Sequence, residues 1–192
     1  MDSSDSRFLI NSSSGGSLVP RRLSLPVSFL RPPAAWTSKV CSMVSHLEFL
    51  FQAFEEVVEY HEMEKIKTIG DNFMASAGLM RPNSEPLLSA VRCGLRMAAV
   101  TEESEPKWQV RVGVHSGPVV AGVVGRIKYQ FDLWGDTVNV AARMTELGTP
   151  GTVTMSHEAW LQVEGSCEGR SLGNLDVKGK GKIGIVECYA TR

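Results

Sequence analysis

Apolar residues recur along this chain with two different periods, which divide it into expected helices and strands. From Ser42 to Glu62 they recur every three or four positions, which is typical of an amphipathic helix with one buried face. A second long helix is expected over Leu87–Val100, after the break at Pro82–Pro86. We expect a short helix over Asp136–Met144 and a capped helical turn over Ser156–Leu161.

Strands are expected where the pattern alternates at every second residue. Glu64–Ile69 and Asn72–Ala77 flank the pair Gly70-Asp71 and therefore predict a β-hairpin. Val119–Val124 is nearly all apolar, so we expect a strand that is buried on both faces. The remaining predicted strands are Trp108–His115, Tyr129–Trp134, Thr152–Met155 and two within Gly173–Ala190, around a Lys-Gly loop.

This order of elements predicts an α+β fold, with a largely antiparallel sheet and helices packed mainly on one face. The 192 residues suffice for one domain with a sizeable core. Residues 1–40 are rich in Ser, Pro and Arg and show no sustained periodicity, so we predict a disordered leader there, floppy or artefactual, and a single domain over 41–192. A targeting segment is the alternative for the leader, because its acids are few.

Composition narrows the classes of function. The formal net charge of -1 argues against a general nucleic-acid binder, and no apolar run approaches the length of a membrane span. Four scattered cysteines without a CxxC pair fit buried thiols in a reducing compartment, so we expect a cytoplasmic location. His157-Glu158 begins like a zinc-protease motif, but Leu161 stands where the second histidine belongs.

The polar residues near the expected turns suggest nucleotide chemistry. Asp71 lies on a tight turn after a glycine, and Asp132 lies on a later strand. Asn139 and Arg143 are four positions apart and therefore share one helix face. A Lys-rich loop with Lys178 follows. Carboxylates, an amide, a guanidinium and a lysine in this order are what the handling of a nucleoside triphosphate requires.

Several segments resemble the catalytic domains of class III nucleotidyl cyclases, of the adenylyl type. They are Glu64–Ala75, Arg111–Gly117, Phe131–Met144 and Val177–Gly181, and the resemblance covers roughly Ser42 to Ala190. It implies a ferredoxin-like, palm-type fold. It also implies conversion of ATP or GTP into the 3′,5′-cyclic nucleotide and pyrophosphate, for intracellular signalling. Such enzymes work as homodimers or heterodimers with sites at the subunit interface.

The resemblance also implies roles for single residues. Asp71 matches the second of two aspartates that hold two divalent cations, Mg²⁺ or Mn²⁺. Lys65 and Asp132 match the pair that selects the base, and a lysine with an aspartate suits adenine, hence ATP. Asn139 matches the residue that orients the ribose, and Arg143 matches the one that stabilises charge on the α-phosphate. Lys178 matches the lysine that contacts the terminal phosphates.

One expected motif is absent. The family's first metal aspartate lies in an Asp-Ile-x-Gly-Phe-Thr strand ahead of the turn, whereas the corresponding region here, Ser24–Pro33, is rich in prolines. We therefore expect the first strand and the first helix of the catalytic core to be missing or replaced by unrelated sequence. Three interpretations remain open: an N-terminally incomplete adenylyl cyclase, a nucleotide-binding half that complements a metal-bearing subunit, and a non-enzymatic nucleotide-binding or dimerisation module.

Overall fold

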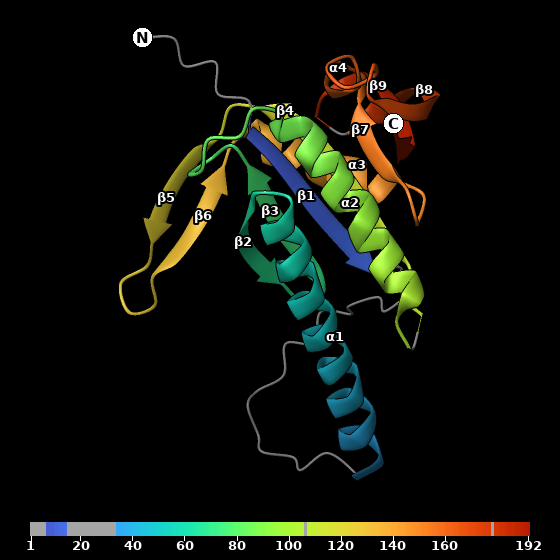
Figure 1. Cartoon of the computed structure of the whole chain (residues 1–192). Helices are drawn as coiled ribbons and strands as arrows, with labels where there is room; N and C mark the ends of the chain where they lie inside the picture. The colour runs from blue at the N-terminus through green and yellow to red at the C-terminus, as the bar shows by residue number, and fades with distance from the viewer. Residues whose placement is uncertain (1–6, 15–33, 106, 178) are drawn as a thin grey trace.

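The main body of the protein is a seven-stranded sheet with the strand order β2-β3-β1-β4-β7-β9-β8 (Figure 1). The computed structural model describes residues 7–14, 34–105, 107–177 and 179–192. The pairing is antiparallel except between β4 and β7. The strands of this sheet are β1 (Arg7–Ser14), β2 (Met63–Ile69), β3 (Asn72–Ala77), β4 (Val110–Gly117), β7 (Val153–Ser156), β8 (Cys167–Val177) and β9 (Gly181–Thr191).

Within the described residues, four helices accompany the sheet: α1 (Ala34–Tyr60), α2 (Pro86–Glu103), α3 (Asp136–Leu147) and α4 (His157–Trp160). The predicted α+β class and the largely antiparallel sheet are confirmed. The hairpin β2–β3 and the terminal pair β8–β9 also form as expected. Helix α1 begins at Ala34, earlier than the periodicity indicated. In the described ranges, no helix combines the length and the apolar character that crossing a bilayer demands.

The centre of the sheet contradicts the expectation that the first strand is missing. β1 lies between β3 and β4 and pairs antiparallel with both, with Ile10 opposite Ala75 on one side and Val114 on the other (Figure 1). The expectation of disorder throughout residues 1–40 was therefore wrong for Arg7–Ser14, and also for residues 34–40, which belong to α1. Strand β1 is stabilised by backbone hydrogen bonds from the neighbouring strands on both sides. The periodicity of a short, Ser-rich segment does not reveal such partners. Residues 1–6 and 15–33 of the predicted leader lie outside the described residues.

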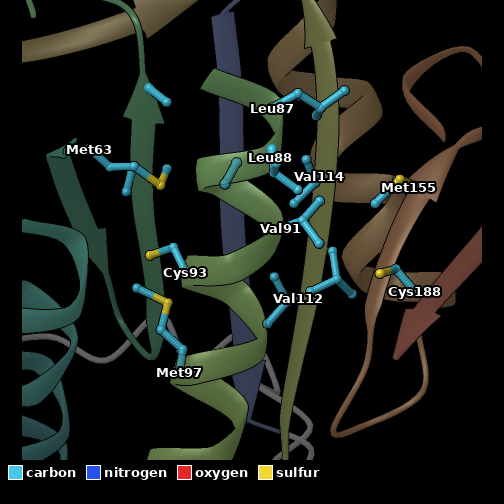
Figure 2. Packing of buried hydrophobic residues seen from close by; sticks show 14 of the residues in the cluster. Met63, Leu87, Leu88, Val91, Cys93, Met97, Val112, Val114, Met155 and Cys188 are labelled. Atoms are coloured by element: carbon cyan, nitrogen blue, oxygen red, sulfur yellow. The ribbon is translucent and has the colours of Figure 1, made fainter. Parts of the chain in front are cut away.

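One face of the sheet packs against α1, α2 and α4 and forms the largest core cluster. Phe54 of α1 meets Phe73 of β3 edge to face, with 5.6 Å between the ring centroids. Val91 and Met97 of α2 are fully buried, and Figure 2 shows Val91 and Leu88 beside Val112 and Val114 of β4. This close-packed layer fixes the positions of β2, β3 and β4, and it thereby positions the turn that carries Asp71.

Helix α3 covers the opposite face of the sheet. The sequence predicted helices mainly on one face and did not say which helix would lie on the other. At Gly113 of β4, an added Cβ would lie 2.3 Å from the Thr145 backbone nitrogen and 2.4 Å from the Ala141 carbonyl oxygen. The helix thus lies directly on the strand backbone. Val140 and Met144 of α3 are buried against Ile185 of β9.

Apart from the buried Val119, the apolar segment expected to be buried on both faces is instead exposed. β5 (Val120–Val124) and β6 (Gln130–Trp134) form a separate two-stranded sheet, called here the arm, which extends away from the main sheet (Figure 1). Strong β-propensity, and not burial within this chain, explains the run of valines. The large exposed side chains of this segment and its tip are Val120, Val123, Val124, Ile127, Tyr129 and Trp134.

Candidate active site

A lysine and an aspartate form a half-buried ion pair where β2 meets β6. Nζ of Lys67 donates to Oδ2 of Asp132 at 2.6 Å, and the side chains are 17% and 14% exposed. The other carboxylate oxygen of Asp132 accepts a hydrogen bond from the Leu133 backbone N–H at 2.7 Å. Asp132 is therefore held by two donors, and Lys67 has little freedom to swing into solvent.

This pair involves a different lysine from the one expected beside Asp132. We expected Lys65 beside Asp132, but Nζ of Lys65 forms an ion pair with Glu55 of α1 and lies 5.5 Å from the centroid of the Phe73 ring. Residues two apart on a regular strand face the same way. Here the pairing of β2 with β3 shifts register between Lys65 and Lys67, and such an irregularity twists a strand locally. The two lysines consequently face different neighbours, α1 and β6.

The second group of expected residues lies on α3. Asn139 and Arg143 both line an open pocket of about 540 Å³. Nη1 of Arg143 bonds Oε2 of Glu146 at 2.5 Å, one turn further along the helix. The other lining residues are Asp136, Val140, Ala142 and Glu146 of α3 and Gly179 and Lys180 of the β8–β9 loop.

Lys180 is a pocket residue that was not among the site residues expected from the sequence. Its ammonium group forms an ion pair with Asp136 in the first turn of α3. The two glycines beside it, Gly179 and Gly181, have φ angles of +82° and +72°, which favour glycine. Lys178 itself lies outside the described residues. The alternation of Lys and Gly was the signal that either lysine could approach a phosphate.

Asp71 lies in the turn between β2 and β3, where Gly70 has a φ of +61° and Asp71 is half-buried. It is not among the residues that line the α3 pocket. The structure therefore joins Asn139 and Arg143 in one pocket but leaves Asp71 at a separate place on the same chain.

The donor set around Asp71 does not fit a two-metal site within one chain. Two hard divalent cations need several oxygen ligands, most of them carboxylates. β1 lies beside β3 and has the sequence RFLINSSS, which contains no acidic residue. Across the part of the chain that the structure describes, no group of three or more His, Cys, Asp or Glu side chains could hold a metal ion.

A histidine lies close to the Asp136–Lys180 pair. Nδ1 of His115 on β4 is 2.7 Å from Oγ of Ser156, which also accepts a hydrogen bond from Ala159 N–H and so caps α4 as predicted. Burial lowers the pKa of His115, and Lys180 lowers it further, while the carboxylates of Glu158 and Asp136 act in the opposite direction. The net result is a pKa below the ordinary value, which keeps the ring neutral at pH 7.

The fold is similar to those of solved nucleotide cyclase domains. The chain superposes on the guanylate cyclase domain of RhGC from Catenaria anguillulae, solved with GTP, with a TM-score of 0.82. The match covers 98% of both chains at 24% sequence identity. It superposes on the adenylyl cyclase CyaB from P. aeruginosa with a TM-score of 0.80, over 97% of this chain and 95% of that one at 17% identity. The fold is that of a class III cyclase domain.

Sequence comparison agrees with the fold. A model of the adenylate and guanylate cyclase catalytic domain matches residues 34–190, and the chain therefore belongs to that family. An adenylate cyclase of Mycobacterium tuberculosis is 37% identical over 143 residues, which is 72% of this chain and 32% of that protein. Guanylate cyclase 2G of Rattus norvegicus is 32% identical over 183 residues, 88% of this chain and 16% of that protein. The chain thus spans a third or less of these relatives.

Proposed function

We propose that this chain is an adenylyl cyclase domain that binds ATP and takes part in forming 3′,5′-cyclic AMP and pyrophosphate. The observation that carries the proposal is the Lys67–Asp132 pair. An ammonium group can donate to N1 of adenine, and a carboxylate can accept from its 6-amino group. Guanine presents the opposite donor and acceptor pattern at these positions. We propose a cytoplasmic location, where ATP is available.

The α3 pocket supports the same proposal. Asn139 would orient the ribose through its amide, and Arg143 would stabilise negative charge at the α-phosphate. Lys180 would contact the terminal phosphates alongside Lys178, once it leaves Asp136. The pocket is open, and its two cations, Arg143 and Lys180, are paired with Glu146 and Asp136, which a triphosphate would have to displace.

We propose a dimer, either of two copies or with another cyclase domain. The arm supports this proposal because Val120, Val123 and Ile127 are 68%, 62% and 93% exposed, an apolar surface that a partner would cover. A partner would also bring its own metal-binding turn towards the Asn139 and Arg143 of this chain. The separation of Asp71 from the α3 pocket fits a site that is completed between two chains.

A second candidate function follows from the sequence of β1. Divalent cations would supply charge neutralisation and an acidified hydroxyl when bound, but this chain offers one matching carboxylate, Asp71. The absence of an acidic residue from RFLINSSS favours a complementing half, which contributes Lys67, Asp132 and the α3 residues to a site whose aspartates belong to a different subunit. Mg²⁺ or Mn²⁺ would then be held mainly by that subunit.

The first experiment measures cyclic AMP formed from ATP with Mn²⁺ by the purified chain, beside Asp71→Ala and Arg143→Ala variants. Turnover that both substitutions abolish supports an enzyme that completes its own site as a homodimer. The chain is then mixed with a cyclase domain that has both aspartates but lacks its own α3 Asn and Arg. Activity in the mixture alone supports the complementing half. A folded chain without turnover in either setting contradicts both functions.

The second experiment tests the choice of base. The double substitution Lys67→Glu with Asp132→Cys installs the pair typical of guanylyl members of the family. We expect the preference for ATP over GTP to invert, measured as the ratio of the two dissociation constants. The matched variant Lys65→Glu leaves that ratio unchanged, because Lys65 faces α1. Equal effects of the two single substitutions at 65 and 67 would contradict the assignment.

A further inference from the structure

A fully buried carboxylate lies beneath the end of α3. Glu187 of β9 is 0% exposed. Two residues earlier on the same strand, Ile185 packs against Val140 and Met144 of α3. Because side chains alternate along a strand, Glu187 lies on the same face of the sheet as α3.

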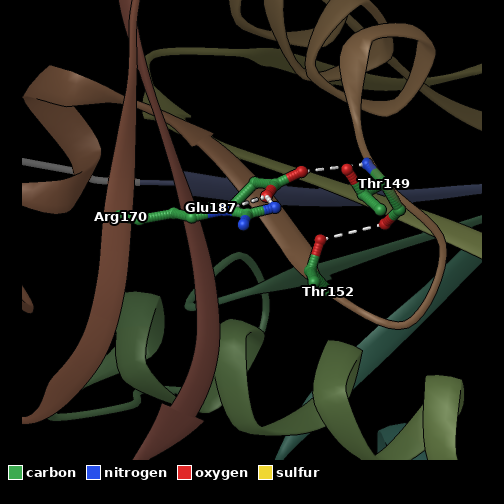
Figure 3. Close-up of polar contacts among 4 residues, drawn as sticks. All are labelled: Thr149, Thr152, Arg170 and Glu187. Carbon is green, nitrogen blue, oxygen red and sulfur yellow. Dashed lines mark hydrogen bonds and ion pairs between the residues drawn. The ribbon is translucent and has the colours of Figure 1, made fainter.

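Both oxygens of this carboxylate are engaged, as Figure 3 shows. Oε1 accepts a hydrogen bond from the Thr149 backbone N–H at 3.2 Å. Oε2 accepts two from Arg170 of β8, from Nε at 2.9 Å and from Nη2 at 2.8 Å. Burial alone would raise the pKa of Glu187, but the bonds from Thr149 and Arg170 outweigh it, and the net pKa lies below the ordinary value. The group is therefore charged at neutral pH.

Thr149 belongs to the loop that ends α3. The helix ends at Leu147, and at the following Gly148 an added Cβ would lie 2.6 Å from Oγ1 of Thr154. Oγ1 of Thr152 donates to the Thr149 carbonyl at 2.9 Å and closes the loop upon itself. The bond from Thr149 to Glu187 thus fixes the last turn of α3 against β9.

The other end of α3 is tied to the same hairpin. Asp136, in the first turn, forms an ion pair with Lys180 of the β8–β9 loop. Asn139 and Arg143 lie between these two ties, and they share the pocket with Gly179 and Lys180. The two walls of the pocket, α3 and the β8–β9 loop, are therefore held in place relative to each other by contacts at both ends of the helix.

Stability alone does not account for a charge at this place. Well-packed apolar groups often stabilise a fold as much as a buried ion pair does. A buried carboxylate, in contrast, constrains geometry through directed hydrogen bonds. We propose that Glu187 is a positioning residue, which sets α3 and the β8–β9 hairpin in the register that Asn139, Arg143 and Lys180 need. This inference rests on the proposed function. A displacement of about 1 Å at a reacting centre can cost on the order of 100-fold in rate.

The test compares Glu187→Gln with Glu103→Gln in the full chain, assayed in whichever setting gives wild-type turnover, alone or with the metal-bearing domain. Glutamine keeps the shape but replaces one acceptor by an amide donor. Glu103 is the matched control, because it forms an exposed ion pair with Arg96 on α2, remote from the pocket residues. Arg170→Gln is the second variant, since the Arg170 side chain is 65% exposed and we expect β8 to stay folded without it.

Two readouts separate positioning from plain stability. For Glu187→Gln we expect amide exchange at Thr149 and in the last turn of α3 to accelerate about tenfold, while exchange in α2 is unchanged. We expect kcat to fall by about 10- to 100-fold with KM for ATP within about threefold. Arg170→Gln should show both effects in weaker form, and Glu103→Gln neither.

Unchanged exchange at Thr149, or faster exchange with an unchanged kcat, overturns the inference. So does an acceleration spread evenly over all helices, which is what a general loss of stability produces. If Glu187→Gln does not fold, Arg170→Gln decides by the same criteria. Failure of the proposed function is a different result, because there the wild-type chain itself binds no ATP in the presence of Mn²⁺.

Discussion

Removing Lys67 is expected to destabilise the protein and weaken ATP binding, whereas removing Lys65 does little of either. Both lysines form an ion pair with a carboxylate, so Lys67→Ala and Lys65→Ala are a matched pair of substitutions on one strand. They differ in surroundings. The side chains of Lys67 and Asp132 are 17% and 14% exposed, against 36% and 48% for those of Lys65 and Glu55.

The magnitude follows from distance and burial. At the observed 2.6 Å, the Lys67–Asp132 attraction is about 6 kcal/mol for an effective dielectric constant of about 20. Desolvation of the two groups offsets most of it, so the net cost of Lys67→Ala in the free energy of unfolding is about 2 kcal/mol. Lys65→Ala loses an exposed pair and one contact with the Phe73 ring, at a cost below about 1 kcal/mol.

Urea unfolding at low and high salt measures these costs, and ATP titration gives the functional effect. Loss of one charged donor to the base predicts an affinity about 10- to 100-fold weaker for Lys67→Ala. High salt should reduce the cost of Lys65→Ala more than that of Lys67→Ala, because exposed pairs are screened more effectively. The reasoning is refuted if Lys65→Ala weakens ATP binding as much as Lys67→Ala.

Three further predictions concern packing, assembly and pH. Gly113→Ala is expected to cost about 2–3 kcal/mol, because its Cβ would overlap the α3 backbone, whereas Gly165→Ala, with open space around it, should leave the melting temperature unchanged. Val123→Asp on the exposed arm should shift sedimentation from dimer to monomer without lowering the melting temperature, and an unaltered dimer would contradict the assembly proposed above. The lowered pKa values of His115 and His61 make the folded state bind fewer protons than the unfolded chain, so stability should be fully present above pH about 6.5 and decline as the pH falls below it. His115→Gln should flatten part of that decline in urea-unfolding free energy measured between pH 7.5 and 5, and an unchanged slope would exclude the contribution of His115.

Local patterns predicted most of the elements but not their pairings across the chain. The hairpin around Gly70-Asp71 and the helix with Asn139 and Arg143 follow from short-range periodicity, and both form where expected. The lysine beside Asp132 could not be read from alternation, because a register shift between Lys65 and Lys67 separates two positions that a regular strand would place together.

The arm and the central strand β1 show two other limits of prediction from the sequence. An apolar run such as Val119–Val124 indicates burial, but it does not say whether the covering surface belongs to the same chain. β1 was missed because a strand with neighbours on both sides is specified by them more than by its own residues. Glu187 gave no signal at all, since a single acid in an alternating strand resembles any exposed position until its partners Thr149 and Arg170 are placed.

The position of β1 has a consequence for how the chain reaches its folded state. The strand is synthesised before both of its partners, yet it is inserted between β3 and β4, which lie far along the chain from it. Contacts so distant in sequence form slowly, and until they form, two apolar strand edges remain open to other molecules. Refolding should therefore contain a slow phase in which the halves of the sheet already exist separately, and aggregation should compete with that phase as the protein concentration rises. A chain that recovers in one fast, concentration-independent step would show that β1 inserts early.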